Sequence, residues 1–218
     1  MSRTTLALSA AVAVLGVLPF AADAAKPPKS PPGKLTLVAT PNPVKFGRSV
    51  TLSGKLTGPN NSGKVVDIFA DPFPYDTFTK VTSSTTNASG GYSTARKPGV
   101  NTRYQARQGA DQSTIVTVLV RPAVSLRLSD YTPRRGQRVR FRGRVCPQHD
   151  GSSLSIQRHY RTGYRTLRKT TLRDILGSTC SSYRKTIRIF RDGRFRAVIG
   201  AHSDHTRGLS TSRVARVH

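Results

Sequence analysis

The chain of 218 residues contains no tryptophan and no glutamate, and its acidic residues are ten aspartates against 36 lysines and arginines. So small a supply of carboxylates argues against a hydrolase that works with a carboxylate pair. The sequence also contains no GxSxG elbow, no HExxH helix and no cysteine with a matching base. We therefore expect a protein that is not an enzyme, with no catalytic residues, no cofactor and no metal site.

The scarcity of acidic residues leaves a formal net charge of +26, which makes the protein a polycation. The charge is distributed unevenly. Residues from Ala25 to Arg121 hold 13 basic and four acidic side chains, whereas residues from Pro122 onward hold 22 and five. Arginine outnumbers lysine 20 to two in the second part. Any role for the charge is therefore expected in the second part.

The N-terminus has the pattern of a signal peptide, residues 1–24. Arg3 precedes an apolar run from Leu6 to Phe20, and Ala22-Asp23-Ala24 supplies small residues for cleavage after Ala24. The alternative, an uncleaved anchor, is disfavoured because the run is short for a membrane span of about 20 residues. Residues 25–34 form a basic, proline-rich spacer. With no second apolar run of spanning length, we expect a mature chain without a transmembrane segment, secreted and either extracellular or held noncovalently at the cell surface.

The rest of the sequence is an internal duplication with a repeat of roughly 90 residues. Residues Phe46 to Leu56 align without a gap with Arg135 to Val145, so that apolar positions and glycines coincide. Further on, Arg103 to Ala106 align with Arg194 to Ala197. The boundary falls at Arg121-Pro122, which predicts two domains, residues 35–121 and 122–218.

Each copy alternates apolar and polar residues with a period of two, which is typical of half-buried strands. Turns rich in Gly, Pro, Asn and Asp separate the strands, and no segment has a helical period. This pattern predicts an all-β fold of two tandem immunoglobulin-like β-sandwich domains. The strands expected in the first copy are 35–39, 49–56, 64–70, 78–85, 92–97, 102–107 and 114–120.

Three short motifs extend this interpretation to a family resemblance. VTLSGKL at Val50 to Leu56, GGYS at Gly90 to Ser93 and NTRYQA at Asn101 to Ala106 resemble the bacterial Ig-like repeats of exported actinobacterial proteins. The resemblance covers both copies, the first more clearly. It implies the fold, whereas such repeats serve as spacers, adhesin stalks and carbohydrate or wall binders, so it implies no single function.

The two cysteines, Cys146 and Cys180, both lie in the second copy. In an exported protein a disulfide between them is the default expectation. Two free thiols, or a bond to another chain, are the alternatives.

Arginines in the second copy recur at alternate positions, so strand geometry places them on one face. If Val139, Phe141 and Val145 point into the core, the intervening arginines point to solvent. The matching positions of the first copy, such as Thr51, Ser53 and Ala95, are nearly neutral, so the fold itself does not require the charge. The predicted cationic face comprises Arg127, Arg138, Arg140, Arg142, Arg144, Arg184 and Arg188.

The guanidinium group binds phosphate and carboxylate through two parallel hydrogen bonds. We therefore hypothesise a non-catalytic secreted protein whose second domain binds an extracellular polyanion: a cell-wall polymer, an acidic polysaccharide, anionic lipid or DNA. The alternative is a solvated basic face that binds nothing and is kept for solubility or by codon bias. A structural or adhesive surface protein with a protein partner is the alternative function.

Three other clusters have simpler structural interpretations. His202 to His205 offers two imidazoles and a carboxylate, and we expect a solvated polar turn. Asp67, Asp71 and Asp76 could bind calcium but are expected to be solvated. The aromatic loop from Phe69 to Phe78 could bind a sugar and is expected to be a packed loop.

Overall fold

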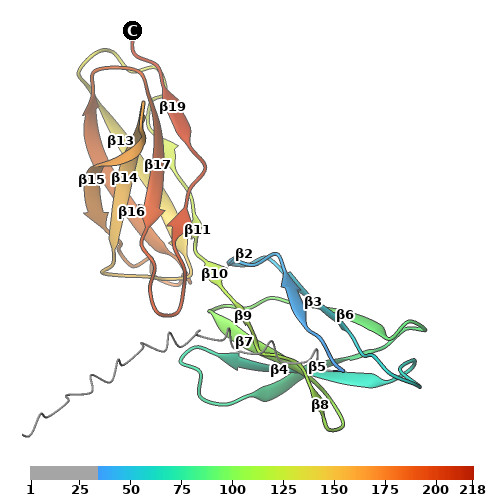
Figure 1. Cartoon of the computed structure of the whole chain (residues 1–218). Helices are drawn as coiled ribbons and strands as arrows, with labels where there is room; N and C mark the ends of the chain where they lie inside the picture. Colours follow the sequence, from blue (N-terminus) through green and yellow to red (C-terminus); the bar gives the residue numbers. More distant parts are fainter. Residues whose placement is uncertain (1–33) are drawn as a thin grey trace, which may run out of the picture. The chain divides into compact units, whose positions relative to one another are not determined.

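The computed structural model describes residues 34–218, and all secondary structure in this range is β (Figure 1). The expected signal peptide and nearly all of the expected spacer lie outside the described residues. Within residues 34–218, no helix is long and apolar enough to cross a membrane.

Strands β1 to β10, in blue to green in Figure 1, form a first sandwich. One sheet has the order β1-β3-β6, and the other has the order β5-β4-β7, with β8 and β9 both pairing with β7. The short β2 pairs in parallel with β10. The strands are β1 (Val38–Thr40), β2 (Val44–Lys45), β3 (Val50–Lys55), β4 (Val65–Pro72), β5 (Thr79–Thr85), β6 (Gly91–Arg96), β7 (Thr102–Gln108), β8 (Asp111–Gln112), β9 (Val116–Val118) and β10 (Val120–Arg121).

Strands β11 to β19, in yellow to red, repeat the arrangement. One sheet holds β11 and β12 on β13, with β16 on the other side of β13, and the second sheet has the order β15-β14-β17 with β18 and β19 on β17. The strands are β11 (Ala123–Val124), β12 (Arg127–Leu128), β13 (Gln137–Cys146), β14 (Ser153–Tyr160), β15 (Gly163–Thr171), β16 (Ser181–Ile189), β17 (Gly193–Ile199), β18 (Gly208–Leu209) and β19 (Arg213–Ala215).

Each sandwich encloses its own hydrophobic core. In the first, inward residues of β3 and β4 such as Leu52 and Ile68 are fully buried and belong to one hydrophobic cluster. In the second, Phe141 and Phe195 pack edge to face with ring centroids 5.1 Å apart. In the first copy, β1, β3 and β6 form one sheet and β4, β5, β7 and β9 form the other, and the second copy repeats this division. This arrangement of two antiparallel sheets is an immunoglobulin-like β-sandwich. The predicted fold class is confirmed.

The two copies share a packing arrangement in which a tyrosine lies over a glycine on the neighbouring strand. Gly54 pairs with Tyr92, and Gly143 pairs with Tyr183. The Tyr183 hydroxyl donates to the Ser125 carbonyl at 2.6 Å, and Tyr92 donates likewise to Thr36. A Cβ on Gly143 would lie 2.0 Å from the Ser125 oxygen, so only glycine leaves room for this contact.

A serine repeats in the same manner beside the sixth strand of each copy. The hydroxyl of Ser113 accepts from the Ala106 N–H, and that of Ser210 accepts from the Ala197 N–H, each at 2.9 Å. Both hydroxyls donate to the carbonyl of the next residue. These buried hydrogen bonds agree with the duplication read from the sequence, because the same polar contacts occur at equivalent strand positions.

Candidate anion-binding groove

The predicted cationic face lies on the sheet formed by β12, β13 and β16. Val139, Phe141 and Val145 on β13 are fully buried, and the arginines between them are exposed. Arg127 on β12 and Arg184 and Arg188 on β16 are exposed as well. The alternation therefore directs side chains as expected, because successive residues of a strand point to opposite faces.

The strand register places several of these arginines directly opposite one another. Arg142 pairs with Arg127 on one side and with Arg184 on the other, so a row of three crosses the sheet. Arg138 pairs with Arg188. Like charges directly opposite each other destabilise a sheet. This sheet therefore carries an electrostatic cost that its fold does not require.

The first copy shows the same register with much less charge, although Lys55 occupies the position of Arg144. There the pair equivalent to Arg142 and Arg184 is Ser53 opposite Ser93, and Thr51 lies opposite Ala95. The strand pairing is the same in both sheets, so the fold itself does not require arginine at these outward positions.

Part of the cationic face is hollowed into a groove of about 1150 Å³. Arg127, Arg142, Arg144 and Arg184 all line it. Three further basic residues, Lys169, Arg173 and Lys185, complete the lining, and Asp174 is its one acidic residue. We call this set the basic groove.

The seven arginines predicted for the cationic face do not all lie in the basic groove. Arg188 lines a second groove, of about 590 Å³, with Arg158, Arg168 and Arg191. Arg138 and Arg140 line neither groove, although both are exposed on β13. The role predicted for all seven arginines stays a prediction, and the four in the basic groove are its strongest members.

Sequence reasoning missed three basic residues of the groove: Lys169, Arg173 and, on β16, Lys185. Lys169 lies on β15, a strand of the other sheet, and Arg173 follows that strand. The period-two pattern of β15 is weak, with Lys169 and its neighbour Arg168 both exposed. A register shift between Ile156 and Gln157 where β14 pairs with β15 adds to the irregularity. The signal available was the local density of basic residues around 165–173.

Among the residues that the structure describes, none forms an ion pair with the arginines of the basic groove. Among residues 34–218 the ion pairs are Lys80 with Asp67, Arg103 with Asp71, and His205 with Asp204. Asp174 accepts instead from the Gln148 amide at 3.0 Å. The groove therefore holds unpaired positive charge.

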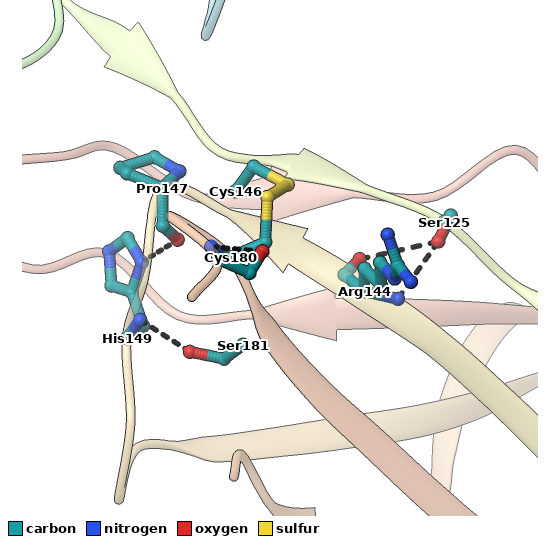
Figure 2. Close-up of a disulfide and its surroundings, with 8 residues drawn as sticks. Ser125, Arg144, Cys146, Pro147, His149, Cys180 and Ser181 are labelled. Atoms are coloured by element: carbon teal, nitrogen blue, oxygen red, sulfur yellow. Dashed lines mark hydrogen bonds between the residues drawn. A yellow bond between two sulfur atoms is a disulfide. The ribbon is translucent and has the colours of Figure 1, made fainter. Parts of the chain in front are cut away.

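The wall of the groove is held rigidly. Tyr183 lines it and is anchored to Ser125 by its hydroxyl, and burial raises the pKa of that phenol. The Arg144 N–H donates to the Ser125 hydroxyl at 2.9 Å, beside the disulfide in Figure 2. Because these contacts use main chain and Tyr183, the guanidinium groups are left free for a ligand.

Cys146 and Cys180 form a disulfide, as predicted. It joins the end of β13 to the residue before β16, the two strands that carry most of the basic groove (Figure 2). A structural disulfide fits an extracellular protein, because such bonds persist in oxidising compartments.

The aspartates considered for calcium are not brought together. Asp67 binds Lys80 at 2.8 Å and the Ser83 hydroxyl at 2.8 Å. These hydrogen bonds, Lys80 first, lower the pKa of Asp67. Asp71 is buried near Arg103 instead, so among the described residues these carboxylates do not form a cation site.

The aromatic loop is packed, as expected. Arg107 lies over the Phe69 ring at 4.1 Å from its centroid, and Arg103 lies over Tyr75 at the same distance. Each of these cation–π contacts covers one face of its ring.

The expectation of a solvated turn at His202 to His205 is wrong for His205. That side chain is 1% exposed and packs with His149, which is 9% exposed. Burial, above all, lowers the pKa of His149.

Comparisons with known proteins add little to this picture. No protein-family model matches the chain, and no curated protein matches it. Among solved structures, it is similar to a marsupial T cell receptor at 13% identity and a TM-score of 0.38, covering 85% of this chain and 73% of that one. It is also similar to a tetra-tandem repeat from the extending region of a large adhesion protein, at 13% identity and a TM-score of 0.33. That match covers 85% of this chain and 49% of the other, about half its length. Similarity as low as this says nothing about the function of the chain.

Proposed function

We propose that the protein is an exported, non-catalytic Ig-like module protein, of the kind found in bacterial surface proteins, that binds an extracellular polyanion in the basic groove of its second sandwich. The ligand chemistry is an extended chain of phosphate or carboxylate groups. Cell-wall polymers, acidic polysaccharides, anionic lipid surfaces and DNA share this chemistry.

The observation that carries the proposal is the contrast between two sheets of one design. Arg142 opposite Arg184 in the second copy replaces Ser53 opposite Ser93 in the first. An arrangement that costs stability and that the fold does not need is explained by a ligand that neutralises it.

The lining of the groove supports an anionic ligand. Its lining is mostly basic and hydroxyl side chains, with Tyr183 and Ile175 as its main apolar members. Pockets for small apolar ligands are lined mainly by hydrophobic and aromatic side chains. Arginine spacing of about 5 Å across strands and about 6.6 Å along them offers repeated bidentate sites to a repeating anion.

The test compares two variants that lose the same net charge. The groove variant carries Arg127→Gln, Arg142→Gln, Arg144→Gln and Arg184→Gln. The control variant carries four substitutions at exposed arginines that line neither the basic groove nor the groove at Arg188: Arg134→Gln, Arg161→Gln, Arg194→Gln and Arg216→Gln.

Retention on purified cell-wall material and on immobilised duplex DNA is measured at increasing salt. We expect the wild-type protein to elute at a salt concentration that the control variant nearly reproduces, and the groove variant to elute much earlier. Binding that resists salt and survives the groove substitutions would refute the proposal and favour an adhesive contact with a protein partner.

A further inference from the structure

Two imidazoles and a carboxylate gather in the second sandwich, from His149, His205 and Asp204. One ligand atom from each residue lies within 4.8 Å of the others. The imidazole of His149 also lies near that of His202, with ring centroids 5.1 Å apart. The residues come from two loops, between β13 and β14 and between β17 and β18, that are distant in sequence.

Both buried imidazoles are oriented by main-chain carbonyls. His149 Nδ1 lies 2.8 Å from the Pro147 oxygen, and His205 Nε2 lies 2.8 Å from the Gly99 oxygen. A carbonyl only accepts, so each of these nitrogens carries its proton. In the neutral ring the other nitrogen then presents a lone pair. Histidines that bind metals are oriented in this way in proteins.

The nitrogens left with lone pairs have no hydrogen-bond partner. His149 Nε2 and His205 Nδ1 are both buried and unpartnered, and both sit on histidines of the cluster. His205 Nδ1 lies 2.9 Å from the Asp204 carboxylate, which is an ion pair if the ring carries a second proton. If the ring is neutral, two acceptor atoms face each other and a metal ion can take the place of that proton, because a buried polar atom without a partner costs about 1–3 kcal/mol.

These residues belong to features that the second copy has and the first lacks. The offset between copies is 91 residues at Gly109 and Gly200 but 97 at Ser113 and Ser210, so six residues are inserted between these points. The longer loop contains Asp204 and His205. On the opposite side, the disulfide and the 2.7 Å bond from the His149 N–H to the Ser181 hydroxyl fix the loop that carries His149 (Figure 2).

We propose that His149 Nε2, His205 Nδ1 and the Asp204 carboxylate bind one divalent transition-metal ion of the zinc type, with water completing the coordination. Two imidazoles and a carboxylate suit zinc and its neighbours, whereas calcium and magnesium prefer oxygen ligands alone. Ligand atoms at about 2.0–2.2 Å from zinc lie closer together than 4.8 Å. Small side-chain movements, for which the partly exposed Asp204 leaves room, would bring the three atoms to these distances.

The experiment uses the whole purified chain, stripped with a chelator and then titrated with zinc chloride by calorimetry. Bound zinc is counted by elemental analysis after dialysis. Asp204→Asn keeps the shape of the most exposed ligand and is the variant least disruptive to folding, and His149→Ala removes a second ligand. His159→Ala removes an exposed histidine outside the cluster and serves as the control.

We expect one zinc ion per chain, a higher melting temperature with zinc, and a loss of affinity of at least tenfold in Asp204→Asn and His149→Ala but not in His159→Ala. Cobalt in place of zinc should give the visible bands of a site with nitrogen ligands, and these should be lost in Asp204→Asn. Stoichiometry well below one, or zinc binding that Asp204→Asn leaves unchanged, would overturn the proposal and leave a plain imidazolium–carboxylate pair.

Discussion

Replacing Gly143 with alanine tests how the wall of the basic groove is built. The new Cβ would lie 2.0 Å from the Ser125 oxygen and 2.8 Å from a ring carbon of Tyr183, so the ring or the strand must move. Overpacking of this kind costs about 1–3 kcal/mol. Loss of the hydrogen bond from Tyr183 to Ser125 adds about 0.5–1.5 kcal/mol.

An opposing effect comes from the unfolded chain, which alanine restricts by about 0.4–1 kcal/mol relative to glycine. The net expectation is a loss of about 2 kcal/mol, or about 10 °C in the melting temperature of a sandwich of this size. Urea unfolding followed by circular dichroism and tyrosine fluorescence measures it, since the chain has no tryptophan.

Gly200→Ala is the matched control, because a Cβ there meets nothing within 4 Å and Gly200 has no positive φ. Tyr183→Phe should cost about 1 kcal/mol alone and almost nothing in the Gly143→Ala background, where the hydrogen bond is already broken. The reasoning is refuted if Gly143→Ala and Gly200→Ala differ by less than about 0.5 kcal/mol.

Two further predictions concern the stability of the sandwiches. Replacing Cys146 and Cys180 with serine should lower the free energy of unfolding by about 3–4 kcal/mol, because the open loop regains its entropy; an unchanged urea midpoint would contradict this. Burial raises the pKa values of Tyr92 and Tyr183, so both phenols hold their protons in the folded state after they ionise in the unfolded state. Stability should be unaffected below about pH 10 and fall above it, by about 1.4 kcal/mol per pH unit for each tyrosine; Tyr183→Phe should reduce that slope in urea titrations at several pH values.

The alternation of apolar residues around Phe141 was enough to predict the outward direction of Arg142 and its neighbours, because a period of two admits only two faces. The duplication was enough to predict the fold of both copies and the neutral counterpart at Ser53. The disulfide followed from the number of cysteines and from the expected export of the chain.

Neither the groove nor the histidine cluster could be predicted in this way. Lys169 reaches the groove from an edge strand of the other sheet, and the pairing of that strand is irregular. His149 and His205 lie 56 positions apart in two loops, and no local pattern brings them together. Burial of His205 depends on contacts between segments distant in sequence, such as that with Gly99, whereas periodicity describes only the segment itself.

The most direct test of the account is the salt dependence of binding to a labelled duplex DNA used as a probe polyanion. Each arginine that neutralises a phosphate contributes about 0.9 to the slope of log K against log salt, so the groove variant should lose a slope of about 3.6 if all four arginines bind. The control variant removes the same charge and should keep nearly the whole wild-type slope. Equal losses in the two variants would contradict a defined groove and reduce the protein to a nonspecific polycation.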